Sequence, residues 1–377
     1  MILQLTNDFA GSKVYMNLFQ NIDSLGFSQI IYTAIREENL VNKNSIDFKS
    51  KDSEIIYSNI LNSFSDRVFY RKKILKIFKD IEKKIDLSKI KFIHAHTWYS
   101  DGGVAYLLHL KYNIPYSIAV RNTDLNLFYK FFLFDRKFAF KILENSRNVF
   151  TISEIYNKRL IDILHKNGII DINKPLTIPN GIDEFWLLNS QEKREYIEQK
   201  DDVRKIVYVG RFTKTKNIVN LLKAVIILNK GSQRYHLSIV GGGGSEEGKV
   251  LNYLERYQSK NYFSFYGTIK DKIELKGIYT SNYIFVMPSL QETFGLVYIE
   301  ALSQGLPVLY VENEGIDGFY DNSIGEKVVM GTPVEISEKI SVMFSNYDRY
   351  KIPFKLIMKN HRWQEIAKKY IEYYFIN

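Results

Sequence analysis

The sequence predicts an α/β protein built from two Rossmann-like, doubly wound parallel-sheet domains that face each other across a cleft. Its 377 residues are too many for one ordinary core and suit two domains of ~150–200 residues each. Short apolar runs rich in β-branched residues alternate with amphipathic stretches, which is the pattern of parallel strands covered by helices. This alternation occurs twice, once on each side of a polar stretch at 189–205 that we interpret as the linker.

The expected elements follow this order along the chain. In the first half, strands are expected at 2–5, 28–33, 92–95, 116–120, 149–153 and 176–179, with helices at 13–25, 102–112 and 125–145. In the second half, strands are expected at 205–210, 236–241, 263–267, 283–287 and 307–311. We therefore expect one domain over 1–185, a second over 186–354, and a C-terminal helix at about 355–377 that can pack back on the first domain.

Composition and charge narrow the function classes. The chain has no cysteine, which excludes disulfides and thiolate metal sites. Its start lacks the basic and apolar regions of a secretory signal, and its apolar runs fall short of the ~20 residues of a membrane span, so we expect a cytoplasmic protein. The net charge of +10 favours an anionic partner. No zinc-finger spacing, aromatic RNA-binding motif or basic tail favours nucleic acid.

The stretch 288–309 is the most informative motif. A helix is expected from about residue 295 to 304, directly after a buried strand and a loop. The backbone amides at its start would form an anion site, aided by the helix dipole, and they belong to Phe294, Gly295 and Leu296. Glu292 and Glu300 are placed to accept hydrogen bonds from sugar hydroxyls; two solvated glutamates at an ordinary turn are the alternative.

Two further motifs accompany it. In 207–218 a strand ends at Gly210, and Arg211 and Lys216 occupy the loop before a helix, where two cations can neutralise a diphosphate. A pair of exposed loop cations is the alternative. In 178–185, a Pro-Asn-Gly sequence predicts a tight turn between the halves.

Together the three motifs resemble the family-four glycosyltransferases of the GT-B class (glycosyl transferases group 1), the retaining enzymes with two facing Rossmann-like domains. Glu292 and Glu300 match that family's E-x7-E signature, and Arg211 and Lys216 match its donor loop. Residues 180–183 match its inter-domain turn. The likeness runs from residue 1 to about residue 331.

The resemblance implies roles for these residues. Arg211 and Lys216, after Gly210, would bind the diphosphate of a nucleotide-sugar donor, Glu300 would hold the ribose, and Glu292 would hold hydroxyls of the transferred sugar. The amides at 294–296 would help to fix sugar and phosphate. Because preorganised cations and amides can stabilise the departing diphosphate, and no Asp-x-Asp cluster is present, we predict catalysis without a metal ion or other cofactor.

The first half carries weaker signals. Gly11 and Ser12 resemble the family's small-residue loop after the first strand, with a plain strand-to-helix loop as the alternative. Arg121, followed by Asp124, stands where many relatives have a histidine, so it is a candidate for binding a phosphate or an acidic sugar. His94 and His96 have strand spacing, but no third ligand is identifiable nearby, and we interpret them as strand-end residues.

The glycine run 240–250 has two alternative interpretations. It lacks the third glycine of a dinucleotide fingerprint and the Ser/Thr of a P-loop. The preferred interpretation is a glycine-rich turn beside the donor site, as in GT-B relatives, which makes Gly242 a candidate donor contact.

Two stretches, 67–91 and 126–141, combine apolar or aromatic residues with many Lys and Arg. They predict contact with an anionic membrane surface, and a core-facing stripe with a solvated back is the alternative. The function expected overall is sugar transfer to a glycan acceptor, lipid-linked, in bacterial surface polysaccharide synthesis at the inner face of the membrane. Alternatives are a GT-B-shaped sugar-nucleotide epimerase and a non-catalytic nucleotide-binding module.

Overall fold

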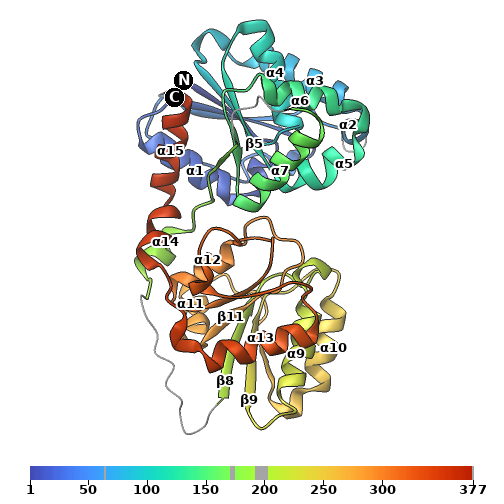
Figure 1. Cartoon of the computed structure of the whole chain (residues 1–377). Helices are drawn as coiled ribbons and strands as arrows, with labels where there is room; N and C mark the ends of the chain where they lie inside the picture. The colour runs from blue at the N-terminus through green and yellow to red at the C-terminus, as the bar shows by residue number, and fades with distance from the viewer. Residues whose placement is uncertain (63–64, 170–174, 192–202, 376–377) are drawn as a thin grey trace. The chain divides into compact units, whose positions relative to one another are not determined.

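The computed structural model describes residues 1–62, 65–169, 175–191 and 203–375. The chain forms two compact units (Figure 1). Unit 1 comprises Met1–Asn180 and the C-terminal segment from Trp363, and unit 2 comprises Gly181–Arg362. The domain boundary expected after residue 185 falls inside a short helix of unit 2, α8 (Glu184–Leu188).

Unit 1 contains a seven-stranded parallel sheet in the order β3-β2-β1-β4-β5-β6-β7. Its strands are β1 (Ile2–Leu5), β2 (Gln29–Ile35), β3 (Glu54–Asn59), β4 (Phe92–Ala95), β5 (Tyr116–Val120), β6 (Val149–Thr151) and β7 (Leu176–Thr177). Its α-helices are α1 (Lys13–Ser24), α2 (Ser65–Val68), α3 (Tyr70–Lys84), α4 (Ser100–Tyr112), α5 (Tyr129–Phe131), α6 (Arg136–Glu144), α7 (Glu154–Lys166) and α15 (Trp363–Phe375). The central strands are buried apolar runs, as a sheet covered on both faces requires.

Unit 2 contains a six-stranded parallel sheet in the order β10-β9-β8-β11-β12-β13. Its strands are β8 (Val203–Val209), β9 (Arg234–Val240), β10 (Phe263–Phe265), β11 (Ile284–Val286), β12 (Val308–Val311) and β13 (Gly325–Val328). Besides α8, its α-helices are α9 (Ile218–Leu228), α10 (Glu247–Arg256), α11 (Lys272–Thr280), α12 (Leu296–Ser303), α13 (Pro333–Ser345) and α14 (Phe354–Asn360). The predicted pair of doubly wound parallel-sheet domains is confirmed.

Several elements differ from the sequence-based expectation. The strands β3 and β13 were not predicted, because β3 is half-exposed and β13 begins with glycine. The single helix expected over 125–145 is instead a π-helix, Asp124–Phe128, followed by α5, a 3-10 turn and α6. It breaks at Phe132, whose backbone (φ −93°, ψ 61°) is not helical. Of the linker expected at 189–205, residues 192–202 lie outside the described residues, and Val203 already begins β8.

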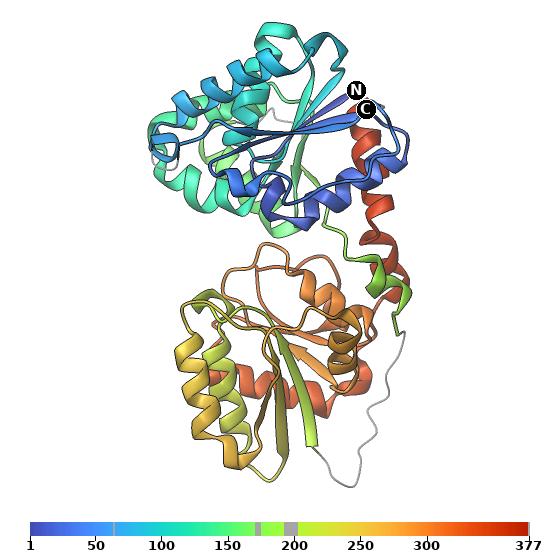
Figure 2. The ribbon, with the colours of Figure 1, turned by 180° about the vertical axis from the view of Figure 1, so that it is seen from behind.

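The C-terminal helix α15 packs on unit 1 beside α1, as Figure 2 shows from behind. The ring of Tyr374 stacks on Phe92 of β4 at a centroid distance of 4.7 Å. Trp363, Ile366 and Tyr370 of α15 are buried in the same cluster. The last segment of the chain therefore completes the core on one face of the first sheet.

Helix α3 turns its apolar stripe to the core. Ile74, Ile77 and Ile81 are buried at helical spacing and pack in the main core cluster of unit 1. The membrane interpretation of 67–91 was therefore wrong for these residues, and the core-facing alternative holds for them. Among the described residues, no helix combines the length and apolar character needed to cross a bilayer.

The strand order of unit 2 sets the place of its functional loops. Strands β8 and β11 are neighbours, yet the chain leaves them toward opposite edges of the sheet. In doubly wound sheets, ligands bind at such a switch point, outside the carboxyl ends of the strands. The loops after β8 and β11 are the two that carry the basic and acidic motifs.

Candidate functional site

The acidic motif follows β11 and leads into α12. The predicted helix is confirmed: it begins at Leu296 and ends at Ser303, and Gly305 follows it with φ 76°. Gly295 adopts φ 77°, and a Cβ there would lie 2.5 Å from the Tyr298 ring, so only glycine fits. The first amides of a helix have no intrahelical acceptor, which leaves the N–H groups at 294–296 placed for a ligand.

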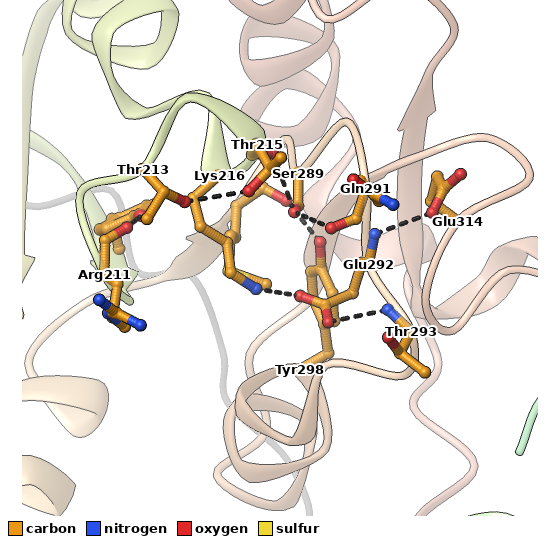
Figure 3. A network of polar contacts seen from close by, with 12 residues as sticks. Arg211, Thr213, Thr215, Lys216, Ser289, Gln291, Glu292, Thr293, Tyr298 and Glu314 are labelled. Atoms are coloured by element: carbon orange, nitrogen blue, oxygen red, sulfur yellow. Dashed lines mark hydrogen bonds and ion pairs between the residues drawn. The ribbon is translucent and has the colours of Figure 1, made fainter. Parts of the chain in front are cut away.

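Glu292 lies at the centre of a polar network, drawn in Figure 3. The residue is only 9% exposed, and its carboxylate forms an ion pair with Lys216 through Oε2. Its Oε1 accepts a hydrogen bond from the backbone N–H of Thr293 at 3.0 Å. The structure thus brings together Glu292 and Lys216, which lie 76 positions apart in the chain.

The loops after β8 and β11 are joined by their backbones. The carbonyl of Thr215 accepts the N–H of Leu290 at 2.8 Å and the hydroxyl of Ser289 at 3.2 Å. Lys216 ends a 3-10 turn, Lys214–Lys216, and Asn217 then enters α9 with φ 58°. These bonds hold the basic loop against the acidic one, so the ion pair forms between two fixed segments.

Arg211 lies on the same loop as Lys216 but does not join the ion pair. Its side chain is exposed and makes no ion pair within the described part of the chain. In Figure 3 the guanidinium of Arg211 and the ammonium of Lys216 extend to the same side of their loop. Unit 2 therefore presents two cations to one region, of which one is neutralised by Glu292.

Glu300 lies inside α12, away from the Lys216 pair. Burial raises its pKa to about 7, against the opposing effect of a hydrogen bond from the Tyr279 hydroxyl at 3.4 Å. Asp183 is close enough to raise this pKa further, and Asp183 pairs with Lys272 at 2.5 Å. Asp183 of the predicted inter-domain turn therefore lies near Glu300, and both residues belong to unit 2.

The glycine run supports the basic loop by close backbone packing. Gly241 (φ 130°) lies against the Gly210 carbonyl, where a Cβ would come within 1.9 Å. Gly243 accepts the N–H of Phe212 at 2.8 Å, and its own N–H donates to the Glu247 carboxylate at 2.7 Å. Gly242 is half-buried beside them. Because a carboxylate occupies a loop amide that a P-loop would offer to phosphate, the P-loop alternative is disfavoured.

In unit 1, Arg121 follows β5 and is half-buried. Its Nε donates to the His96 carbonyl at 3.3 Å, and its guanidinium lies 5.9 Å from the ring centroid of Tyr15 and hydrogen-bonds Tyr370. Asp124 accepts three backbone N–H groups, including that of Arg121 at 2.8 Å. Burial raises the pKa of Asp124 to about 6. The loop after β5 is thus tied to the loop after β4.

The small-residue loop after β1 forms a 3-10 turn, Phe9–Gly11, and Ser12 is the residue before α1. A Cβ on Gly11 would meet the Asp8 carboxylate at 2.5 Å. The Ser12 side chain makes no capping hydrogen bond to α1. Both candidates lie at the carboxyl end of β1, next to the helix start that bears Tyr15.

His94 and His96 are fully buried in unit 1, with ring centroids 4.1 Å apart and nearly parallel planes. His94 Nδ1 bonds the Tyr374 hydroxyl of α15, and His96 Nε2 bonds Gln4 at 3.0 Å. Burial holds the pKa of both imidazoles well below the usual value. Within the described ranges, no group of three or more His, Cys, Asp or Glu side chains is arranged to hold a metal ion.

Sequence reasoning missed Glu314. Its Oε2 accepts the backbone N–H of Glu292 at 2.8 Å, while the Gly315 N–H donates to the Glu292 carbonyl at 3.0 Å. A Cβ on Gly315 would lie 3.0 Å from Glu292 Cγ, so the two loops touch. A Glu-Gly pair shortly after a buried strand was the only available signal, and it is common in ordinary turns.

Comparisons with known proteins match the second half of the chain to a family model and longer parts of the chain to several relatives. Residues 189–370 match the family model described as glycosyl transferases group 1. An uncharacterised glycosyltransferase of Methanocaldococcus jannaschii is 28% identical over 321 residues, 79% of each chain. An alpha-monoglucosyldiacylglycerol synthase of Acholeplasma laidlawii is 25% identical over 271 residues, 66% of each chain. Among solved structures, Anabaena HepE in complex with UDP superposes with a TM-score of 0.71 at 14% identity, covering 98% of both chains.

Proposed function

Since this chain carries a glycosyl transferases group 1 domain in a GT-B fold, we propose that it is a retaining hexosyltransferase that uses a nucleotide-diphospho sugar. The acceptor is a glycan, lipid-linked, in the synthesis of a bacterial surface polysaccharide such as a capsule, an O-antigen or a lipopolysaccharide. The observation that carries the proposal is the Lys216–Glu292 pair at the switch point of unit 2, with Arg211 on the same loop.

Sugar transfer from such a donor requires that the departing diphosphate be stabilised. The bond between the anomeric carbon and the diphosphate oxygen breaks, and negative charge develops on the diphosphate. A new bond forms from the anomeric carbon to an acceptor hydroxyl oxygen, whose proton passes to the departing diphosphate. Arg211 and Lys216 would neutralise that charge, with Gly210 and Gly242 permitting close backbone approach. The amides of Phe294, Gly295 and Leu296 would add dipoles at the start of α12. With these groups, transfer proceeds without a metal ion or other cofactor.

The two glutamates take separate roles. Glu292, held beside Lys216, would accept hydrogen bonds from hydroxyls of the transferred sugar, which fixes the sugar next to the cations. Glu300, deeper in α12, would hold the ribose. A half-buried carboxylate whose pKa lies near neutrality is a suitable acceptor for two neighbouring hydroxyls.

In unit 1 we assign the acceptor side, with Gly11 and Ser12 allowing close approach after β1. Arg121 would bind a phosphate or an acidic sugar. It is a half-buried cation at the carboxyl end of β5, and no ion pair to a carboxylate satisfies it within the described residues.

A lipid-linked acceptor would account for the positive net charge of the chain. The net charge of +10 would favour the anionic inner face of the cell membrane, where a cytoplasmic enzyme would meet such an acceptor. The similarity to a diacylglycerol glycolipid synthase supports this choice of acceptor. Nucleic acid is not proposed as a partner.

A thermal-shift panel of uridine, guanosine and adenosine diphospho sugars tests the proposal, because a ligand that binds the folded state raises its apparent stability. We expect one base to stabilise the protein, and a matching transfer assay to show loss of donor only when an acceptor is present. Release of a free epimer without acceptor would favour the epimerase alternative. Binding without any turnover would favour a nucleotide-binding module.

A further inference from the structure

Six large apolar side chains are exposed at one corner of unit 1, where α2 leads into α3 and where the chain runs from β5 to α6. Phe134 is fully exposed to solvent, and Phe131 is 71% exposed. The exposed corner consists of Val68, Phe69, Leu127, Phe131, Leu133 and Phe134. Single exposed apolar residues are ordinary, but such a group in two adjoining segments indicates a contact surface.

The two segments form one surface. Arg71, at the start of α3, pairs with Asp135 at 2.6 Å, so the second segment lies directly against the first. The ring of Tyr70 packs edge-on against Phe132 at 6.2 Å, beneath the exposed side chains. Figure 1 shows α2, α3 and α5 at the same side of unit 1. The buried Tyr70 ring and the half-buried Phe132 ring thus anchor a corner whose outer side chains point to solvent.

Lysines surround this corner. Lys72, Lys130 and Lys137 are exposed and make no ion pair within the part of the chain that the structure describes. The ammonium of Lys72 lies 5.0 Å from the ring centroid of Phe69. Aromatic and leucine side chains between lysines match an anionic bilayer, where apolar groups enter the headgroup boundary and cations meet lipid phosphates.

We propose that the exposed corner inserts into the interface of an anionic membrane, with Phe131 and Phe134 as the inserting side chains. The corner lies within the two stretches that the sequence predicted, 67–91 and 126–141, but it includes only the start of the first. Lys73 is buried and donates to Ser100 at 2.6 Å, so it cannot meet a headgroup. The apolar stripe of α3 belongs to the core, and of this helix Lys72, in the first turn, lies beside the corner.

The position of the corner connects it with the proposed acceptor side. The segment that bears Phe131 and Phe134 is the direct continuation of the loop that bears Arg121, through the π-helix Asp124–Phe128. Insertion there would hold the carboxyl edge of the first sheet close to the lipid surface. The inference deepens the proposed function by naming its membrane partner, and it rests on that function only for the reason why the protein would be at the membrane.

Flotation with vesicles of phosphatidylcholine, with or without phosphatidylglycerol, tests the inference without donor or acceptor. We expect the full chain to float with phosphatidylglycerol vesicles, and at least tenfold weaker partitioning for Phe131→Ser/Phe134→Ser and for Lys72→Gln/Lys130→Gln/Lys137→Gln. Matched controls are Ile273→Ser, which removes a 72%-exposed apolar side chain of unit 2, and Lys223→Gln/Lys230→Gln. Neither control should weaken flotation.

Each outcome decides the inference. Wild-type flotation by the double phenylalanine variant, or no flotation of the wild type with phosphatidylglycerol, overturns it. The inference is also overturned if the wild type is a dimer that does not bind vesicles and the phenylalanine variant is a monomer. The corner would then contact a second copy of the chain. Phe134→Ser alone removes a side chain with no burial, so it keeps the test valid if the double variant fails to fold. Transfer to a water-soluble acceptor measures the proposed function separately.

Discussion

The carboxylate of Glu314 accepts the backbone N–H of Glu292 at 2.8 Å, and the following residue, Gly315, donates its own N–H to the Glu292 carbonyl at 3.0 Å. Both polar groups of the Glu292 backbone are therefore held by the loop after β12. The side chain of Glu292 is held separately, by Lys216 and the Thr293 N–H (Figure 3). Glu314 is thus placed to position Glu292 through its backbone.

We expect Glu314→Ala to lower kcat/KM about tenfold to hundredfold, as the loss of a hydrogen bond to a charged group of ~1.5–3 kcal/mol would. Glu314→Gln should recover most of the rate, because its amide oxygen can still accept the Glu292 N–H. Glu312→Ala is the matched control: it removes a carboxylate that pairs with Lys327 at the end of the same strand. Equal rates for the Ala variants at 312 and 314 would refute the positioning role.

The ion pair itself gives a second prediction. Glu292→Gln and Lys216→Met should each lower transfer at least a hundredfold, which corresponds to ~2.7 kcal/mol of transition-state stabilisation. Lys214→Met, in the same 3-10 turn, should leave the rate within about threefold of wild type, since Lys214 is exposed and forms no ion pair within the described ranges. Steady-state rates at saturating donor measure this. Near-normal turnover by Glu292→Gln would remove Glu292 from the reaction.

The fold could be predicted from sequence because alternating buried strands and amphipathic helices carry their own periodicity. The predicted positions of the main strands along the chain and the helix after β11 agree with the structure. The half-exposed strand β3 and the Gly-led β13 were missed because neither forms a continuous apolar run. The broken helix after β5 was missed because its break at Phe132 depends on tertiary packing around Tyr70.

Only part of the candidate site could be predicted from the sequence, because its contacts also depend on tertiary structure. Charged residues in loops after buried strands point to one edge of a sheet, so Glu292, Lys216 and Arg211 could be chosen from the amino-acid sequence. Which of the two cations would pair with Glu292 depends on the Thr215 carbonyl holding the two loops together. Glu314 reaches Glu292 from a third loop, and no local pattern indicates such a contact.

Chelation tests the metal prediction. If Arg211 and Lys216 neutralise the departing diphosphate, EDTA should leave the transfer rate within about twofold of the untreated enzyme. Added Mg²⁺ or Mn²⁺ should not raise the rate of Lys216→Met to that of wild type, because no carboxylate cluster within the described residues is arranged to hold a metal ion in place of the lost ammonium. An absolute requirement for either ion would contradict the assignment.

Glu300 gives a pH dependence of donor binding. Burial raises its pKa to about 7, so the carboxylate is mostly neutral below that value and ionised above it. Ribose hydroxyls donate better to the ionised form, so donor affinity should rise as the pH increases from 6 to 8, and then level off. Titration calorimetry across that range, compared with Glu300→Gln, measures the effect. If Glu300→Gln keeps the full pH dependence of donor affinity, that dependence arises from another group.

Acid should destabilise unit 1 through its buried histidines. His94 and His96 have lowered pKa values in the folded state, so the unfolded chain binds more protons as the pH falls below ~6.5. Protonation of each imidazole in the unfolded chain therefore lowers the free energy of unfolding as the pH falls from 6.5 to 5. The raised pKa values of Asp101 and Asp124 act in the opposite direction, because these carboxyls bind protons more readily in the folded state. The change in unfolding free energy of the wild type with pH is therefore not decisive by itself.

Urea unfolding at both pH values should be compared between wild type, His94→Gln/His96→Gln and the exposed-site control His165→Gln. We expect the double variant to lose less stability on acidification than the other two; equal losses in all three would show that the stacked pair does not titrate on unfolding.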